Sequence, residues 1–511
     1  MKLKKIAALL SVAGLSAPAF ATNGAAMEGY GPVSTAMGGT SAAYDNGAAG
    51  LINNPATLGL MKTDSSRLDL AIGGLHPNVG VSSPGQGSTK SGGTSYYLPA
   101  GGYIRKDGKL TWGIGLFAQG GMGSEYRGNS FLSGFVGTTG VAADSSFATG
   151  VNVPSGRDQR TELALGRVFI PLVYDVTDNL RIGGTLDYVW GGFDFKMQMS
   201  GQGLLQLFGN STIGGAARDN ANKNGLGYIS SGISGALINS QLAPLLAPAQ
   251  GGTGGAAAGI NFAYFNADRG TDKFSQQLTT SGFAPNFGFA WQATPALSIG
   301  AAYHGKTTLS DFSGSGSMTV DFNGGVAGGR NTGTFNGQFR VINLQWPSSA
   351  SLGVAYQATD KLMLAADVKN INWSQTFQQI HIRFTTGAGI LDMGLNQNFK
   401  DQNIAQLGMA YKVTDALTLR AGASLTDNPV PAGNMFYLFP ATIANTYTMG
   451  AGYALSKYSS VDFSLSIAPS VSVTNPGVGA AAAGTGLTGL PRTTSTHSQS
   501  NNWQLMFSQK F

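Results

Sequence analysis

The chain contains no cysteine, and only 11% of its 511 residues are charged. Without cysteine it forms no disulfide and has no thiol nucleophile. A soluble domain normally carries charge on about a quarter of its residues. The chain also has no stretch that approaches the ~18 consecutive apolar residues of a transmembrane helix. Low charge without long apolar runs is typical of a transmembrane β-barrel, in which lipid-facing residues alternate with lumen-facing ones.

The N-terminus has the pattern of a secretory signal peptide. Lys2, Lys4 and Lys5 precede a short apolar run at 6–15, and Ala19-Phe20-Ala21 fits the small-x-small cleavage pattern. We therefore expect residues 1–21 to be removed on export. Removal of these three lysines lowers the formal net charge from +6 to +3. Basic clusters that would hold phosphates are lacking, so we predict no nucleic-acid partner.

Strand-like segments begin near residue 66 and show apolar residues at every second position. Two segments meet at Pro347 without turn residues between them, and we interpret them as one irregular strand. Fourteen strands are predicted in this way: 67–75, 98–105, 110–121, 161–176, 180–199, 282–293, 297–311, 336–358, 362–384, 403–412, 417–426, 445–455, 461–473 and 502–511.

Short turns and long loops alternate between these strands. The long connections are 76–97, 122–160, 200–281, 312–335, 385–402, 427–444 and 474–501. An even strand count with short turns at one end and long loops at the other is the plan of outer-membrane barrels. A soluble β-sandwich has no reason to separate loop lengths in this way. We therefore predict an all-β fold, a fourteen-stranded antiparallel transmembrane barrel over residues 62–511.

The alternation also assigns faces. In 297–306, Leu297, Ile299 and Tyr303 share one face, which leaves His304 and Lys306 on the other. Polar sets should point inward, because a charge on the lipid face near the midplane costs ~2–4 kcal/mol. In 180–199 the apolar parity changes after Gly191-Gly192, and we expect a β-bulge there that restores the facing.

Residues 22–61 do not alternate, and they contain eight Gly and eight Ala with only two charged side chains, Glu28 and Asp45. Small residues allow close packing, so we expect this segment to fill the barrel lumen as a plug, or hatch. Asn54 can cap a helix that begins at Pro55, the position that each residue favours.

We find no catalytic or cofactor motif and predict that the protein is not an enzyme. The four histidines are far apart in sequence and not at metal-ligand spacing, so no metal or cofactor is expected. A Ser–His pair of an outer-membrane phospholipase lacks a supporting nucleophile motif. Inward cationic groups are candidates to bind an anionic ligand head group: Lys306, Arg420 and His304. The alternative is that lumen charges are neutralised by Asp187, Asp367, Glu28 or Asp45.

Two features concern partners. The last strand alternates and ends in the aromatic residue Phe511, which resembles the signal read by the outer-membrane barrel-assembly machinery. The 200–281 loop carries apolar residues between 204 and 246. It is either a mobile solvated loop or an apolar surface patch that first captures a hydrophobic ligand.

Several short motifs resemble the FadL/TodX family of outer-membrane transporters for hydrophobic compounds. They are Asn54-Pro55-Ala56, Trp373-Ser374-Gln375 followed by Phe377-Gln378-Gln379, Phe399-Lys400-Asp401, and Asp427-Asn428-Pro429-Val430-Pro431-Ala432. Their order and spacing match over essentially the whole mature chain.

This resemblance implies passive uptake of long-chain fatty acids or other hydrophobic ligands across the outer membrane of a Gram-negative bacterium, in contact with outer-membrane lipid. It implies a hatch at Asn54, Pro55 and Ala56, whose movement releases the ligand to a wall opening. The opening would lie where the third strand, 110–121, kinks, and Gly120, Gly121 and Gly123 are the flexible positions expected there.

Three other functions remain open from the sequence. The same fold can carry aromatic or aliphatic hydrocarbons instead of fatty acids. A structural or adhesive surface barrel would show no ligand-dependent phenotype on deletion, and a general porin would conduct ions.

Overall fold

The computed structural model describes residues 24–135, 153–200, 227–231, 260–268, 277–323, 330–387, 389–443, 445–476 and 493–511. The predicted signal peptide lies outside these residues, as does most of the 200–281 stretch. No described helix is both long and apolar enough to cross a membrane.

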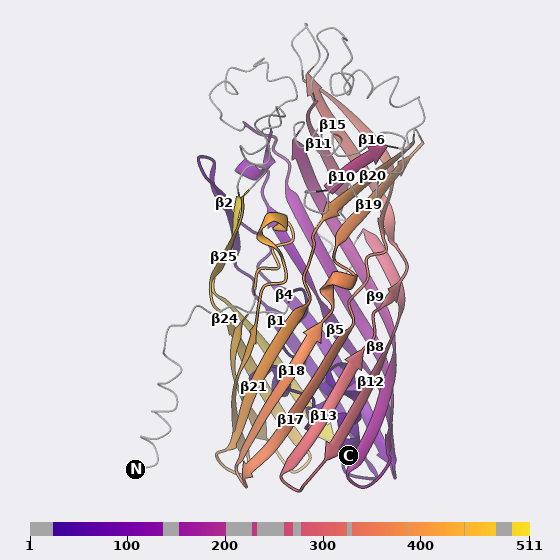
Figure 1. Ribbon diagram of the computed structural model, residues 1–511, viewed down its shortest axis with the longest axis vertical. Helices are drawn as coiled ribbons and strands as arrows, with labels where there is room; N and C mark the ends of the chain where they lie inside the picture. The colour runs from indigo at the N-terminus through magenta and orange to yellow at the C-terminus, as the bar shows by residue number, and fades with distance from the viewer. Residues whose placement is uncertain are drawn as a thin grey trace.

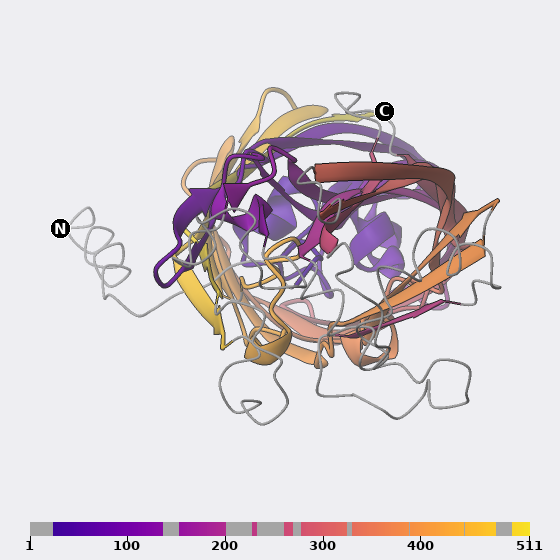
Figure 2. The same cartoon turned by 90° about the horizontal axis from the view of Figure 1, so that it is seen from above.

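The structure is a tall, closed barrel of tilted antiparallel strands, with a small helical segment inside its lower half (Figures 1 and 2). The helical segment contains α2 (Pro32–Ala36), η2 (Gly47–Ala49), α3 (Gly50–Asn53) and η3 (Pro55–Leu60), where η denotes a 3-10 helix. Other 3-10 helices are η4 (Phe131–Ser133), η10 (Trp373–Gln375) and η11 (Ala432–Asn434).

The lower wall closes through one ladder of neighbours, in which the last strand pairs with the first. In order around the ring these strands are β1 (Ser65–Leu75), β4 (Tyr96–Asp107), β5 (Leu110–Tyr126), β8 (Gln159–Asp175), β9 (Leu180–Ser200), β12 (Leu278–Gln292), β13 (Leu297–His304), β17 (Ser349–Thr359), β18 (Leu362–Ile371), β21 (Gln402–Lys412), β22 (Leu417–Thr426), β23 (Thr446–Ala454), β24 (Ser459–Ala468) and β27 (Ser500–Lys510).

The same sheet continues upward through further strands. These are β10 (Gly227–Ser231), β11 (Ile260–Ala267), β14 (Thr308–Leu309), β15 (Phe312–Asn323), β16 (Arg330–Ile342), β19 (Gln379–Thr386) and β20 (Gly389–Asn396). A four-stranded sheet beside it contains β2 (Val79–Ser83), β3 (Gly87–Lys90), β25 (Val471–Asn475) and β26 (Thr493–His497), and β6 (Gly134–Phe135) pairs with β7 (Val153–Pro154). Much of what the sequence assigns to long loops is therefore strand above the lower ring.

The predicted count of fourteen strands is wrong for the barrel sheet. With each interrupted strand counted once, the sheet contains sixteen strands. The two additional strands are β10 and β11, which come from the stretch 200–281 that was expected to be one loop. β11 pairs with β9 and β15, and β10 pairs with β20. The upper wall therefore contains more strands than the alternation predicts.

The predicted irregular strand 336–358 is interrupted at the place expected, because β16 ends at Ile342 and β17 begins at Ser349, with Pro347 in the gap between them. Neighbouring strands are interrupted beside this break, at η10 between β18 and β19 and at 397–401 between β20 and β21. The interruptions bury large apolar side chains, among them Trp346, Trp373 and Phe399. Burial of aromatic surface offsets the lost ladder hydrogen bonds.

No bulge interrupts β9 at Gly191-Gly192, because its pairing with β8 and β12 runs through both residues in constant register. The apolar residues change from even to odd positions because lipid contacts the outer face of the lower strand, whereas apolar side chains fill the lumen beside the upper strand. Below the glycines, Leu186 and Tyr188 are exposed on the outside, whereas above them Phe193 and Phe195 are buried in the upper lumen. The upper lumen is therefore apolar, which the assumption of a polar interior missed.

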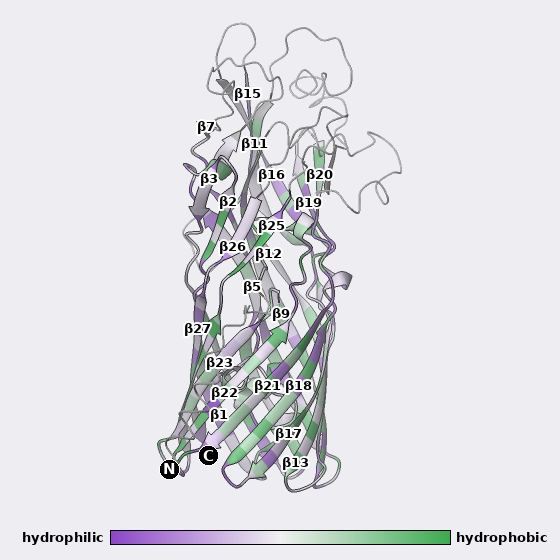
Figure 3. Ribbon diagram, turned by 60° about the vertical axis from the view of Figure 1, so that its left-hand side comes forward, coloured by the Kyte–Doolittle hydropathy of each residue, from purple (hydrophilic) through white to green (hydrophobic). Residues whose placement is uncertain are grey.

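The lower outer surface carries the apolar belt expected of a membrane-spanning barrel. Leu352, Val368 and Phe287 are each more than half exposed on this surface. Figure 3 shows hydrophobic segments along the lower strands, including β17, β18 and β21. The short turns lie at this lower end of the barrel, and the upper strands extend above the apolar belt (Figure 1).

Candidate functional site

Residues 24–61 lie inside the ring and are almost entirely buried (Figure 2). Asn54 begins η3 as predicted, since its side-chain oxygen accepts a hydrogen bond from the Ala56 N–H at 3.1 Å and Pro55 takes the first position. Its amide nitrogen also donates to the Ala42 carbonyl at 2.6 Å and to the Phe289 carbonyl of β12 at 3.0 Å. Asn54 therefore caps η3 and ties the hatch to the wall.

Lumen carboxylates hold the hatch at two sides. Asp367 of β18 accepts hydrogen bonds from the backbone N–H groups of Ser41 and Ala42, at 2.7 and 3.0 Å. Asp45 of the hatch forms an ion pair with Arg67 of β1 at 2.9 Å. Charge-assisted hydrogen bonds of this kind are stronger than neutral ones, so the hatch is a fixed part of the closed structure.

His304 lies at the contact between hatch and wall. One ring nitrogen is 3.0 Å from the side-chain oxygen of Asn286, and the other is 2.9 Å from the Asn53 carbonyl of α3. Asn286 in turn donates to Asp187, which pairs with Arg167 at 3.0 Å. His304 is thus engaged in a hydrogen-bonded chain from the wall to the hatch.

The other two predicted head-group residues have different environments. Arg420 faces the lumen and forms an ion pair with Asp462 at 2.8 Å, so a wall carboxylate already neutralises it. Lys306 does not face the lumen as expected, because its side chain is exposed while Thr307 and Leu309 beside it are buried. The regular alternation ends where β13 ends at His304, and the facing changes at Gly305.

Lys369 of β18 is a lumen-facing cation that the sequence reasoning did not select. It lies on the same strand face as Asp367, and no hydrogen bond or ion pair to a described residue holds it. With Arg167, His304 and Tyr30 it lines a cavity of about 20 Å³ between the hatch and the wall. Its position on the polar side of the alternating segment 362–369 is the signal that points to it.

The wall is irregular where the third predicted strand was expected to kink. The pairing of β5 with β8 shifts register between Ala118 and Gly120, which makes Gln119 an extra residue. Gly120 has a φ of +147°, a conformation that favours glycine. The Gly121 N–H donates to the Ala25 carbonyl at 3.1 Å, so the start of the hatch contacts the wall at this bulge.

An apolar cavity of about 150 Å³ lies against the bulge. It contains Gly120, Gly121 and Gly123, the three positions expected at the kink. The remaining walls are mostly apolar and come from the hatch, the strands around the bulge and the upper segments: Gly24, Leu75, Pro77, Val79, Tyr96, Leu98, Met122, Glu162, Leu163, Ala164, Pro440, Ala441, Ile443, His497, Ser500 and Asn502.

The ionisable groups of this cavity leave it without a positive charge. None of the described lining residues is Lys or Arg. Glu162 is ion-paired with Arg160, which lies outside the lining. Burial lowers the pKa of His497 to about 4, so the imidazole is neutral at neutral pH. A neutral apolar molecule therefore fits this cavity better than a carboxylate.

The sequence reasoning missed the fold of the segment 427–444, which was assigned to a long external loop. Its central part folds into the upper lumen, where Leu438, Phe439 and Ala441 are buried. The ring of Phe439 stacks on Phe193 of β9 at 5.8 Å between centroids. The signal is its composition, because the run Met435–Pro440 is apolar and aromatic, which is unusual for a solvated loop.

Substitution of Arg420 and of Lys306 tests the different environments of these two predicted cations, since Arg420 is ion-paired and Lys306 is exposed. We expect Arg420→Ala to destabilise the barrel by ~3–5 kcal/mol, because it leaves the largely buried Asp462 unpaired. Lys306→Ala should change neither stability nor ligand uptake, since its side chain is exposed. Heat-dependent mobility in gels measures the first effect, and the double variant Arg420→Ala with Asp462→Ala should recover part of the loss. A loss of uptake in Lys306→Ala would contradict this assignment.

Comparison with known proteins identifies similar chains. A family model described as outer membrane protein transport protein (OMPP1/FadL/TodX) matches residues 159–498, which confirms the resemblance seen in the short motifs. The outer membrane protein P1 of Haemophilus influenzae is 28% identical over 187 residues, which are 37% of this chain and 38% of that protein. The chain thus matches well under half the length of this curated relative.

Two solved structures are similar over nearly their whole length. The toluene transporter TodX of Pseudomonas putida has a TM-score of 0.72 and 25% identity, and the match covers 95% of this chain and 99% of that chain. The toluene transporter TbuX of Ralstonia pickettii has a TM-score of 0.67 and 25% identity, over 95% and 99% of the two chains. These matches agree with a closed antiparallel barrel that contains an N-terminal helical segment, and with an outer-membrane location.

Proposed function

Because the chain belongs to the OMPP1/FadL/TodX family of outer membrane protein transport proteins, we propose that it is a passive channel for hydrophobic molecules. In this proposal the ligand enters through the apolar upper lumen, reaches the cavity at the β5 bulge and leaves through the wall beside it. The protein acts by binding and diffusion, not as an enzyme. Recognition of Phe511 by the assembly machinery stays a prediction.

The observation that carries this proposal is the cavity at the bulge. Its volume of about 150 Å³ equals that of an engineered apolar cavity that binds benzene, at about 150 Å³. It has no basic side chain among the described lining residues, and its histidine is neutral. We therefore propose small neutral hydrophobic molecules, such as monoaromatic compounds, as the first cargo. The two similar structures named as toluene transporters support this choice.

Long-chain fatty acids, the first choice from the sequence, are the second candidate. Lys369 favours them, because it faces the lumen beside Arg167 with no partner among the described residues. A carboxylate that reaches this cation would gain a charge-assisted hydrogen bond of ~1.5–3 kcal/mol. The cavity around Lys369 holds little more than a water molecule, so the hatch would have to move first.

Two substitutions separate these cargoes. Ala441→Trp should fill the cavity and reduce toluene uptake to the level of cells that lack the protein, whereas the exposed Ala432→Trp in the same segment should have no effect. Lys369→Met should leave toluene uptake unchanged. The measurement is initial uptake of labelled toluene and oleate by cells that express each variant.

Fatty acids become the cargo if Lys369→Met lowers oleate uptake about tenfold, the effect of one lost charge-assisted hydrogen bond, and Ala441→Trp spares toluene. A structural or adhesive role would be indicated if neither labelled compound entered faster than in cells without the protein.

A further inference from the structure

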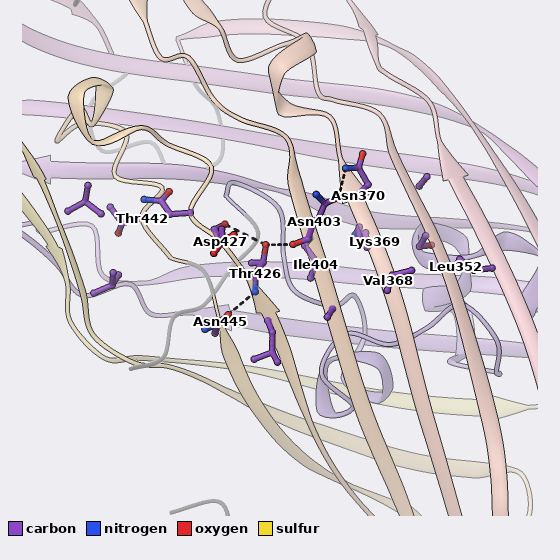
Figure 4. A pocket seen from close by; sticks show the side chains of 17 residues that line it. Leu352, Val368, Lys369, Asn370, Asn403, Ile404, Thr426, Asp427, Thr442 and Asn445 are labelled. Atoms are coloured by element: carbon purple, nitrogen blue, oxygen red, sulfur yellow. Dashed lines mark hydrogen bonds between the residues drawn. The ribbon is translucent and has the colours of Figure 1, made fainter. Parts of the chain in front are cut away.

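A second, larger groove lies on the outside of the barrel, against β17, β18, β21 and β22 (Figure 4). Its volume is about 1020 Å³, at the upper end of the range of about 300–1,000 Å³ typical of ligand sites. In the ring, six strands separate β21 from β5 in either direction, so the groove lies opposite the bulge. It is therefore a different place from the cavity proposed for uptake.

The floor of the groove is apolar and can be reached from the membrane. Leu352 and Val368 are exposed by 54% and 59% on the outer face of the wall. Ala405 and Leu425 continue this face on the next strands, and Val471 and Val473 of β25 complete the floor. An alkyl chain fits such a surface through burial of apolar area.

The rim consists of amide and carboxylate groups that gather at one end of the groove (Figure 4). The Asn370 amide donates to the side-chain oxygen of Asn403 at 2.9 Å, and the Thr426 N–H donates to the side-chain oxygen of Asn445 at 2.7 Å. These bonds hold the two side-chain oxygens, and the amide N–H groups of Asn403 and Asn445 donate to no described residue, so a ligand can accept from them. Asp427 adds an exposed carboxylate that pairs with no described cation.

The charge of the rim selects the head group of a ligand. Lys369 is the one basic residue among the described lining residues, and it also lines the lumen cavity beside Arg167 and His304, on the inner side of β18. A phosphate or carboxylate head would thus meet Asp427 without a compensating cation, and like charges repel. Hydroxyl groups, by contrast, donate to a carboxylate and accept from amides. The combination of Asp and Asn with an apolar floor fits a chain that carries an uncharged, hydroxylated head.

We propose that this groove is a binding site for an amphiphile with an alkyl chain and a neutral, sugar-like head group, taken from the outer leaflet side of the wall. Leu352, Val368 and Leu425 contact the chain, while Asp427, Asn403 and Asn445 bind the hydroxyl groups. The site does not depend on the proposed uptake function, because it lies on the opposite side of the barrel.

Photolabelling in lipid nanodiscs tests the proposal. The probe is dodecyl maltoside with a diazirine in its chain, and the comparison probe has the same chain with a sulfate head. Mass spectrometry should locate maltoside adducts on peptides that carry Leu352 or Val368, in about tenfold excess over Leu186 and Phe287, which are similarly exposed. The sulfate probe should label both groups of peptides equally.

Variants make the result specific. Ala405→Trp should fill the groove and remove the excess labelling. Ala451→Trp on the outer face of β23 serves as the matched control, because its cross-strand neighbours Leu419 and Phe463 do not line the groove. Asp427→Ala combined with Asn403→Ala should reduce maltoside adducts about tenfold through lost hydrogen bonds to the head. Equal maltoside labelling around the whole barrel, or the same excess with the sulfate probe, would overturn the proposal. Uptake of toluene should be unchanged in Ala405→Trp, which separates this site from the channel.

Discussion

Ala48→Cys combined with Gly102→Cys is expected to abolish uptake under oxidising conditions while the barrel still assembles. Ala48 belongs to η2 of the hatch and Gly102 to β4 of the wall, and a Cβ built at Gly102 lies 3.0 Å from that of Ala48. Disulfides need about 3.5–4.5 Å between these atoms, so a small shift of the hatch allows the bond. The chain has no other cysteine, and the two new thiols can pair only with each other.

The reason for the expected loss is that the start of the hatch contacts the wall at the bulge, where the Gly121 N–H donates to the Ala25 carbonyl, so the hatch must move before a ligand leaves beside Gly120. Asn54, Asp367 and Asp45 hold it in place through contacts that must break before it moves. Labelled toluene uptake, compared with and without reductant, measures the effect. The single variants should transport normally, and reductant should restore the double variant. Full uptake by the oxidised protein would show that the ligand passes without movement of this part of the hatch.

The lower barrel could be predicted from the sequence because one physical rule governs it. Lipid on one side and a polar lumen on the other impose alternation, which placed Tyr303 outside and His304 inside. The cap at Asn54 is local, since it depends on two residues and a short helix. The resemblance to the family predicted a kink at Gly120, Gly121 and Gly123, and the structure has a β-bulge at this place.

The upper barrel could not be predicted in the same way, because its lumen is apolar. Apolar residues there point inward, whereas in the lower barrel they point outward to the lipid. Phe193 and Phe195 point inward there, and the alternation alone suggested a bulge that does not exist. Buried aromatic contacts between distant segments, such as Phe439 with Phe193, hold the central part of the predicted 427–444 loop inside the lumen. Lys306 was misplaced for a related reason, since regular facing ends with β13.

Deletion of Gln119 is expected to abolish uptake by closing the wall at the bulge. Inward residues of β5 are odd-numbered before the shift, as at Thr111 and Phe117, and even-numbered after it, as at Ser124 and Tyr126. β5 therefore contains one extra residue relative to β8. When it is removed, the residues after it still point to the same sides of the wall, and the pairing with β8 becomes continuous. Continuous pairing would leave no gap beside Gly120 through which a ligand reaches the membrane.

Gln119→Ala is the matched control, because it keeps the extra residue and the backbone carbonyl that accepts the Tyr30 hydroxyl. We expect it to transport normally, and both variants to show the heat-dependent mobility of a folded barrel. If the deletion variant still takes up toluene and the oxidised disulfide variant does not, the ligand leaves downward past the hatch. If the deletion blocks uptake and the disulfide does not, the wall alone is the exit. If uptake is lost in both variants, the hatch and the bulge act in series. The contact between Ala25 and Gly121 leads us to expect this result.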